Sequence, residues 1–588
     1  MAAVVEETAA AGGATTSEEI KPYQIHVSSR YLGLTKEKLE ITRLPHELST
    51  PKSEDWWEPK PQVEPLIDFW LEEYSWRTHE DELNAQLPQF RTGFSISQSE
   101  APIRIHFIHI RSSHSNAIPL LMIPPFPFTN LSFGHMTKAF TDPDDVTNNQ
   151  PFHLVIPSLP GLGFSDALPN NTPVISTTAE MLNSLMARLE YTHYLASNLG
   201  SASASPAKID WQIVHYLSTE HLNSCLGVHF IAPPLAQPKL QEAPLEWAKW
   251  SIASLFKVPM LGYLGEDFSA LERRRSPKKS KKHSTPTHSG LNQLGLREPN
   301  TLAYALCDSP TGLLVFALKS LRLLGPKREF TQAEIITFTQ LAWLPGPEAA
   351  MRFWAYCLQH PETTTKKAPP RPRIAITVFL GDEPEESEPQ AEAQPEDLEI
   401  QKPVKLEDND DYACPSWANA KYHVVYAHRA NGKSGMLAWE RPELIADGVR
   451  GLAKQILRLD SRLKPSAVPE TVPLAQVIAD VDGATGSGTE GGPASATAAS
   501  TAATAPSTKL QPPTPTLDAT TQPSIPTADG LLAPIPEERG QPHREISEET
   551  RVASDAEEQE AKLKAKSDDT LASTSPGVVP VDSPLSVP

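Results

Sequence analysis

The 588-residue sequence contains few cysteines and no long apolar run. Cys225, Cys307, Cys357 and Cys414 are far apart and form no C-x-x-C pair, so we expect neither a zinc site nor a disulfide framework. No segment approaches the ~20 consecutive apolar residues that cross a membrane. The first 19 residues lack the positively charged start and the apolar centre of a signal peptide. These absences predict a cytoplasmic protein without a transmembrane anchor.

Residues 465–588 contain no Phe, Trp or Tyr, although they include 17 prolines. A segment without large apolar side chains cannot offset the conformational entropy that it loses on folding. We therefore expect a disordered C-terminal tail, and a short disordered N-terminus over residues 1–19.

The formal net charge of −20 is concentrated in two segments. Residues 382–411 hold 13 acidic and 2 basic residues, and residues 465–588 hold 18 acidic and 7 basic residues. Each segment therefore carries −11, which leaves about +2 for the rest of the chain. The acidic balance describes two appendages and says little about what the folded part binds.

One basic run, R-R-R-S-P-K-K-S-K-K, occupies residues 273–282 within an expected loop over residues 272–288. Such runs are usually solvated, and the alternatives are a nuclear address or a contact with a polyanion. No nucleic-acid partner is expected.

The folded part of the sequence alternates between strand-like and helix-like patterns. Residues 35–90 are typical of helices, and short β-rich runs such as I-R-I-H-F-I-H-I (103–110) follow, separated by helical stretches. A further strand is expected after the helical block, over R-I-A-I-T-V-F (373–379). This alternation predicts an α/β core with a mostly parallel sheet. We assign a helical N-terminal region to residues 20–100 and the two parts of the core to residues 101–238 and 369–464. An inserted helical cap is expected over residues 239–368.

Several motifs, in order, resemble the microsomal-type epoxide hydrolases, which belong to the α/β-hydrolase superfamily. They are K-P-Y-Q-I-H-V (21–27), S-W-R-T-H-E-D-E-L-N-A-Q-L-P-Q-F (75–90), P-S-L-P-G-L-G-F-S-D (157–166), T-L-A-Y-A-L-C-D-S-P-T-G-L (301–313) and P-E-L (442–444). The resemblance covers roughly residues 20–460 and implies an α/β-hydrolase fold with an N-terminal leader and a cap.

The resemblance also implies which positions would open an epoxide. In that family an Asp on a strand-to-helix turn attacks the ring, a His with an acidic partner activates water, and two cap tyrosines donate to the ring oxygen. The turn here is A-S-N-L-G, so the nucleophile position holds Asn198. A neutral amide lacks the nucleophilicity of a carboxylate, and we expect ester formation to be lost.

The remaining positions depart from the family pattern too. The base position corresponds to Gly435, with His428 on the same loop as a candidate substitute, and the acid position corresponds to Asp382. The cap donors correspond to Leu291 and Trp354, neither of which can supply a proton as a tyrosine does.

The oxyanion-side loop reads Pro124-Pro125-Phe126-Pro127, where the family has H-G-x-P. A pair of backbone donors from Phe126 and Leu199 is the remaining expectation for this site. Ser197 and Ser201 flank the turn, but the sequence has no G-x-S-x-G motif, no Walker loop and no metal-ligand spacing. We expect no cofactor and no metal.

Three hypotheses remain open on the sequence. The first is a family member that keeps the fold, has lost efficient hydrolysis, and binds a lipophilic small molecule or a protein partner. The second is an epoxide hydrolase that works through a modified site. The third is an interaction protein that acts through its charged loops and its tail.

Overall fold

The computed structural model describes residues 18–47, 57, 59–202, 205–275, 298–324, 328–362, 371–381 and 412–463. The predicted tail, the acidic segment and most of the basic run lie outside these residues. The strands are β1 (Lys21–Pro22), β2 (Gln89–Phe94), β3 (Ile103–Ile110), β4 (Ile118–Ile123), β5 (Phe152–Pro157), β6 (Tyr194–Asn198), β7 (Cys225–Ile231), β8 (Arg373–Phe379) and β9 (His423–Ala430).

The helices fall into four groups along the chain. Before β2 lie α1 (Ser29–Glu40), α2 (Lys60–Glu72) and α3 (Trp76–Gln86), and between β4 and β7 lie η1 (Asn130–Met136), α4 (Thr137–Thr141), α5 (Val174–Arg188), η2 (Pro206–Lys208) and α6 (Ile209–Glu220). The helical insertion between β7 and β8 holds α7 (Pro244–Phe256), α8 (Gly265–Arg275), α10 (Pro299–Asp308), α11 (Pro310–Leu324), α12 (Gln332–Trp343) and α13 (Glu348–Gln359). The last group is η3 (Pro415–Ala420), α14 (Leu437–Glu440), α15 (Pro442–Leu459) and η4 (Ser461–Leu463).

The described strands form one sheet in the order β1-β2-β3-β5-β4-β6-β7-β8-β9. Pairing is antiparallel from β1 to β5 and parallel from β5 to β9. The strand predicted over residues 103–110 is confirmed as β3, and the one predicted over residues 373–379 is confirmed as β8. The mostly parallel sheet confirms the predicted α/β core.

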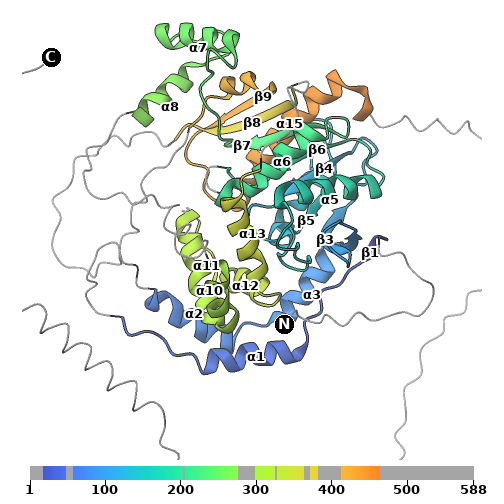
Figure 1. Cartoon of the computed structure of the whole chain (residues 1–588), viewed down its shortest axis with the longest axis vertical. Helices are drawn as coiled ribbons and strands as arrows, with labels where there is room; N and C mark the ends of the chain where they lie inside the picture. The colour runs from blue at the N-terminus through green and yellow to red at the C-terminus, as the bar shows by residue number, and fades with distance from the viewer. Residues whose placement is uncertain are drawn as a thin grey trace, which may run out of the picture. The chain divides into compact units, whose positions relative to one another are not determined.

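Helices cover both faces of this sheet because successive side chains of a strand point to opposite faces. On β4, Leu121 and Ile123 pack in the cluster that includes α5 and α6, whereas Leu120 and Met122 pack in the cluster that includes α15. On α15, the buried residues Ile445, Val449, Leu452 and Ile456 recur at helical spacing. Figure 1 shows α5, α6 and α15 against the sheet.

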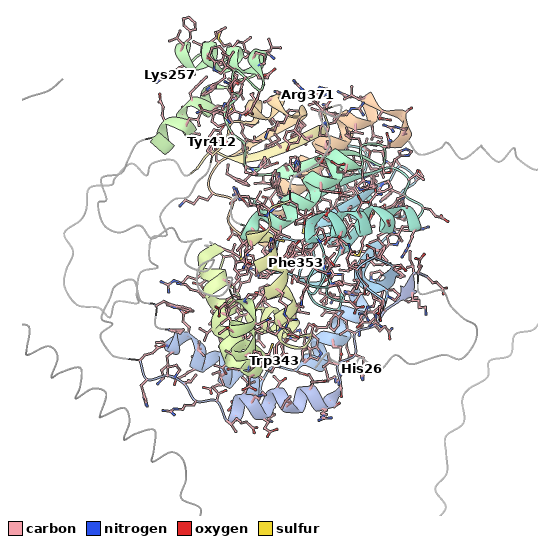
Figure 2. All side chains as sticks on the ribbon, viewed as in Figure 1. His26, Lys257, Trp343, Phe353, Arg371 and Tyr412 are labelled. Carbon is pink, nitrogen blue, oxygen red and sulfur yellow. The ribbon has the colours of Figure 1, made fainter. Side chains whose placement is uncertain are left out.

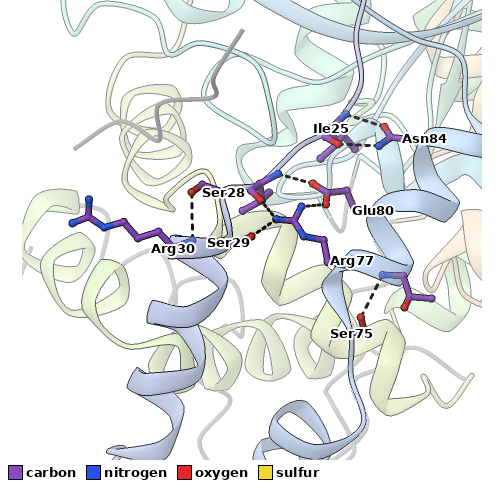
Figure 3. A network of polar contacts seen from close by, with 10 residues as sticks. Ile25, Ser28, Ser29, Arg30, Ser75, Arg77, Glu80 and Asn84 are labelled. Atoms are coloured by element: carbon purple, nitrogen blue, oxygen red, sulfur yellow. Dashed lines mark hydrogen bonds and ion pairs between the residues drawn. The ribbon is translucent and has the colours of Figure 1, made fainter. Parts of the chain in front are cut away.

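Hydrogen bonds from side chains of α3, rather than pairing along a long strand, attach the N-terminal segment to α3 (Figure 3). Asn84 accepts a hydrogen bond from the Ile25 amide at 2.8 Å and donates to the Ile25 carbonyl at 2.9 Å. Glu80, which is buried, accepts from the Val27 amide at 2.5 Å, and Arg77 donates to both Glu80 and the Val27 carbonyl. The N-terminal region, for which helices are predicted over residues 35–90, therefore also contributes extended backbone to the sheet edge, through β1 and β2.

The helical insertion divides into two packed parts (Figure 1). Helices α11 and α12 pack on α1 and α2, with Leu66 and Trp70 against Leu314 and Ile336. Helix α7 packs instead against η3, on the side of the sheet edge formed by β9. The sequence predicts one cap over residues 239–368, but its first two helices have a different neighbour from the rest. No single described helix has the length and apolar character needed to cross a membrane, although the sharply bent pair α10 and α11 passes that test jointly.

Candidate functional site

Asn198 is the last residue of β6 and is completely buried. Its Oδ1 accepts a hydrogen bond from the Ile231 amide at the end of β7, at 3.2 Å, and its Nδ2 donates to the Gly200 carbonyl at 2.5 Å. The amide group therefore bonds the backbone on both sides. A carboxylate at this position could not donate to Gly200, so an aspartate here would lose this hydrogen bond.

The turn after β6 is packed closely against the loop after β4. A side chain on Gly200 would place its Cβ 2.5 Å from Cβ of Pro125, which is closer than real Cβ contacts. The Leu199 amide donates to the Ile123 carbonyl at 3.0 Å. The oxyanion donor predicted at Leu199 is therefore already engaged in the sheet.

Phe126, the other predicted oxyanion residue, lies in a loop whose Phe126–Pro127 peptide is cis. Its buried ring packs on two aromatic residues of α13, with ring centroids 6.4 Å from Phe353 and 5.6 Å from Trp354. Figure 2 labels Phe353 on α13 beside the core. The loop that would hold an oxyanion thus serves as an aromatic contact between the core and the insertion.

The predicted base positions do not bring an imidazole to the turn. Gly435 has a positive φ of 54°, and a Cβ there would lie 2.3 Å from Oε2 of Glu440. His428 lies on β9 opposite Thr377 of β8, and β7 and β8 separate it from β6. Three strand spacings amount to about 14 Å, so His428 does not reach Asn198.

A different imidazole, which no sequence motif indicates, lies beside β6. His229 of β7 is completely buried, with Nδ1 3.0 Å from Oγ of Ser197 and Nε2 2.9 Å from Oγ1 of Thr377. Burial lowers the pKa of His229 to about 3, so it is neutral near pH 7. A Cβ on Gly448 of α15 would lie 2.1 Å from its Nε2, so the ring fills the space beneath that helix. The only sequence signal was a His inside an apolar strand, which is more often a core residue than a base.

A carboxylate does lie next to the turn, on α6. Asp210 is completely buried, and its Oδ2 lies 3.4 Å from the place that a Cβ on Gly200 would occupy. Neither of its carboxylate oxygens has a hydrogen-bond partner within ordinary geometry among the described residues. Burial raises the pKa of Asp210 to about 6, against smaller opposing effects from Ser205, the Trp211 amide and Asn198. In the sequence, Asp210 is marked only as an acidic residue in the first turn of a largely apolar helix.

A cavity of about 440 Å³ lies where the loops of the core meet the insertion. Most of its lining is apolar and comes from residues 126–129 and 161–163, from η2, and from α11, α12 and α13. Three buried polar atoms on its lining residues, Oγ1 of Thr129, Oγ of Ser205 and Nε1 of Trp354, have no hydrogen-bond partner among the described residues. Asn198 and Asp210 do not line this cavity.

Of the predicted site residues, only Phe126 and Trp354 therefore meet at the cavity. Asn198 and Leu199 lie in the packed turn beside it, and Gly435 and His428 lie elsewhere. Asp382 and Leu291 fall outside the described residues. Within the described part of the chain, no three His, Cys, Asp or Glu side chains are arranged to hold a metal ion.

Comparisons with known proteins agree with this architecture. Residues 20–133 match the family described as "Epoxide hydrolase N terminus". The chain is 28% identical over 343 residues to a putative epoxide hydrolase from Stigmatella aurantiaca, covering 56% of this chain and 68% of that one. It is 24% identical over 473 residues to epoxide hydrolase 1 from Sus scrofa, covering 75% of this chain and 91% of that one.

Two solved structures share the fold. The epoxide hydrolase from Aspergillus niger matches with a TM-score of 0.52 and 18% identity, over 75% of this chain and 97% of that one. The juvenile hormone epoxide hydrolase from Bombyx mori matches with a TM-score of 0.52 and 21% identity, over 75% of this chain and 96% of that one.

Proposed function

The chain belongs to the epoxide hydrolase family of the α/β-hydrolases, and we propose that it is a member without efficient epoxide hydrolysis that binds a lipophilic small molecule. The observation that carries this proposal is the environment of Asn198. Its amide is bonded to the backbone on both sides, and Asn198 is not among the residues that line the cavity. The residue at the family's nucleophile position therefore links β6 to β7 here, through the hydrogen bond from the Ile231 amide.

Turnover needs a nucleophile and a base that share one reacting centre. The neutral amide of Asn198 supports no attack on the ring, and His428 lies three strands away. His229 is close to the turn, but it is buried beneath α15 and bonded through both nitrogens. These arrangements favour ligand binding over catalysis of epoxide hydrolysis.

The cavity supports a ligand that is largely apolar. An apolar pocket with a few polar groups favours a lipophilic molecule and fixes its orientation through those groups. Oγ1 of Thr129 and Nε1 of Trp354 would provide such groups, since neither has a partner among the described residues. A ligand with one or two polar atoms on an apolar body fits this lining.

A second candidate function is slow epoxide hydrolysis through Asp210. The observation that favours it is an unpartnered carboxylate beside the turn, next to Ser205, which lines the cavity. Ionised Asp210 would attack a ring carbon, the ring C–O bond would break, and the alkoxide would take up a proton from water. A second water would then hydrolyse the ester to give the diol and restore the carboxylate.

The test is incubation of the full chain with styrene oxide, followed by intact-mass measurement and diol analysis. The proposal expects no covalent adduct and no diol above the background without protein. Organic extraction of the purified protein is expected to release a lipophilic compound, in smaller amount from a Trp354→Ala variant. An adduct mapped to Asp210, absent in Asp210→Asn, would establish the second function, and multiple turnover by the native chain would overturn the first.

A further inference from the structure

The cavity that meets the insertion has a single charged residue on its lining. Among the described residues that border it, Lys208 carries a charge, and all the others are apolar or neutral. A few polar groups on an apolar lining determine which ligand binds and how it is oriented. The neutral residues with polar side chains are Thr129, Ser132, Ser205, Ser320, Thr339 and Trp354.

The ammonium group of Lys208 has neither an ion-pair partner nor a hydrogen-bond partner within the described part of the chain. Other lysines nearby in the sequence are paired: Lys249 with Glu246 at 2.9 Å, and Lys257 with Glu272. Lys208 is also partly exposed, so a charged group that pairs with it would keep contact with water. The described residues therefore leave this positive charge available to a ligand.

The backbone holds Lys208 beside the cavity in an unusual conformation. Ala207 has a φ of 50° and Lys208 a φ of 55°, so two consecutive residues other than glycine lie in the left-handed region. Residues in such conformations persist only where their surroundings hold them, and they are concentrated at binding sites. Here Gln212 donates to the Ala207 carbonyl at 2.6 Å, and the Lys208 amide donates to the Ser205 carbonyl at 3.0 Å. The segment also packs on α13.

Lys208 is the N-cap residue of α6, and its side chain makes no capping hydrogen bond. An ammonium group donates and cannot accept, so it does not neutralise the partial positive charge at the start of a helix. Asp210 in the first turn offsets part of that charge, but it is completely buried and does not line the cavity. Asp210 also forms no ion pair with Lys208. The charge that the lining presents to a ligand is therefore positive.

The rest of the lining suits a long apolar body. Phe316 and Leu321 of α11, Phe338 of α12, and Met351 and Leu358 of α13 contribute large apolar side chains. The volume of about 440 Å³ falls within the range of ligand pockets, which is roughly 300–1,000 Å³. A ligand that fits this lining has one charged end and a hydrocarbon body.

We propose that the ligand of this cavity is a long-chain monocarboxylic acid, whose carboxylate pairs with Lys208 and whose hydrocarbon chain lies along the apolar lining. This inference rests on the proposed function, because it specifies the class of lipophilic molecule that binds. An ammonium group and a carboxylate form a charge-assisted hydrogen bond. One lysine matches the single charge of a carboxylate, whereas a phosphate monoester carries about −1.5 to −2 at pH 7. A neutral lipid would leave the ammonium group without a partner.

The experiment measures the binding of radiolabelled myristate and radiolabelled methyl myristate to the full chain by equilibrium dialysis. The two probes share one hydrocarbon chain and differ in charge. The native chain is expected to bind myristate about tenfold more tightly than the ester, since a hydrogen bond between charged groups contributes about this factor. Lys208→Met is expected to lose that preference, and Lys208→Arg to keep most of it. The matched control, Lys454→Met, removes an exposed lysine of α15 that does not line the cavity and should keep the preference.

The outcomes distinguish this inference from the proposed function. Equal affinity of the native chain for the two probes would overturn the inference while lipophilic binding stands, and this comparison does not depend on the folding of any variant. A preference for myristate that survives in Lys208→Met would overturn it as well. Tighter binding of tetradecylamine than of myristate would also overturn it, because Asp210 rather than Lys208 would then select the charge of the ligand. Absence of binding of all three probes would contradict the proposed function itself, and the inference with it.

Discussion

Arg429 forms a two-pronged ion pair with Asp267, in which Nε lies 2.7 Å from Oδ1 and Nη2 lies 2.9 Å from Oδ2. Tyr412 also donates to this carboxylate, and Asp267 is completely buried. Burial acts to raise the pKa of Asp267, but the hydrogen bonds from Arg429 and Tyr412 outweigh it and lower that pKa. The pair joins α8 to β9, so it fixes the start of the helical insertion to the edge of the sheet.

The first prediction concerns this pair. Arg429→Ala leaves the Asp267 charge buried without its main partner and is expected to reduce the free energy of unfolding by about 3–5 kcal/mol. Urea unfolding monitored by circular dichroism measures the change. The control Glu242→Ala removes one member of the exposed Lys239–Glu242 pair and is expected to cost less than about 0.5 kcal/mol. Equal effects of the two changes would show that Asp267 is solvated.

The second prediction concerns the pH dependence that Asp210 imposes. Its pKa is raised to about 6 in the folded chain, so the folded state holds this proton more tightly than the unfolded state, whose Asp pKa is about 3.9. The group therefore destabilises the fold as pH rises through that interval, with the full penalty above about pH 6. Asp210→Asn is expected to stabilise the protein by about 1–3 kcal/mol near pH 7 and by much less near pH 4.

Urea unfolding of Asp210→Asn and of the native chain at both pH values measures this difference. Asp144→Asn, on an exposed carboxylate, is the control and should change stability by less than about 0.5 kcal/mol at either pH. A stabilisation that is the same at both pH values would contradict the assignment of a buried, unpartnered carboxylate.

The third prediction restores the family's nucleophile. Asn198→Asp removes the donor to the Gly200 carbonyl and places a charge in a buried turn, so it is expected to cost about 2 kcal/mol or more. It is also expected to yield no diol from styrene oxide over many cycles, because His229, the described imidazole beside the turn, is buried and bonded through both ring nitrogens. Asn116→Asp at an exposed position controls for the change of charge. Sustained diol formation by Asn198→Asp would contradict the proposed loss of the base.

The fourth prediction tests the close packing of the turn. Gly200→Ala would bring a methyl group within 2.5 Å of Pro125 and is expected to destabilise the protein by about 1–3 kcal/mol. Gly33→Ala, on α1, meets nothing within 4 Å and is expected to stabilise by about 0.5–1 kcal/mol. Thermal unfolding of the two variants would therefore shift in opposite directions. A neutral Gly200→Ala would show that the turn is loosely packed.

Much of the architecture follows from local patterns. The apolar strand runs over residues 103–110 and 373–379 and the amphipathic repeat of α15 are short-range signals, so they can be recognised without knowledge of the neighbours. The strands β1 and β2 were not recognised, because the N-terminal region looked helical and a two-residue strand has no periodicity. Local patterns also do not indicate that the insertion divides into two parts, because this division depends on which surface each helix packs against.

The sequence by itself determined that a neutral amide occupies the nucleophile position, because residue identity does not depend on the fold. Only the tertiary structure decided what surrounds that amide: the Ile231 and Gly200 backbone groups that bond it, the unpartnered carboxylate of Asp210, and the distance to His428. Apart from the bond to Gly200, which lies two residues away in the same turn, these relationships join different strands or helices. Strand order and helix packing determine these relationships, and neither can be predicted from a local sequence pattern.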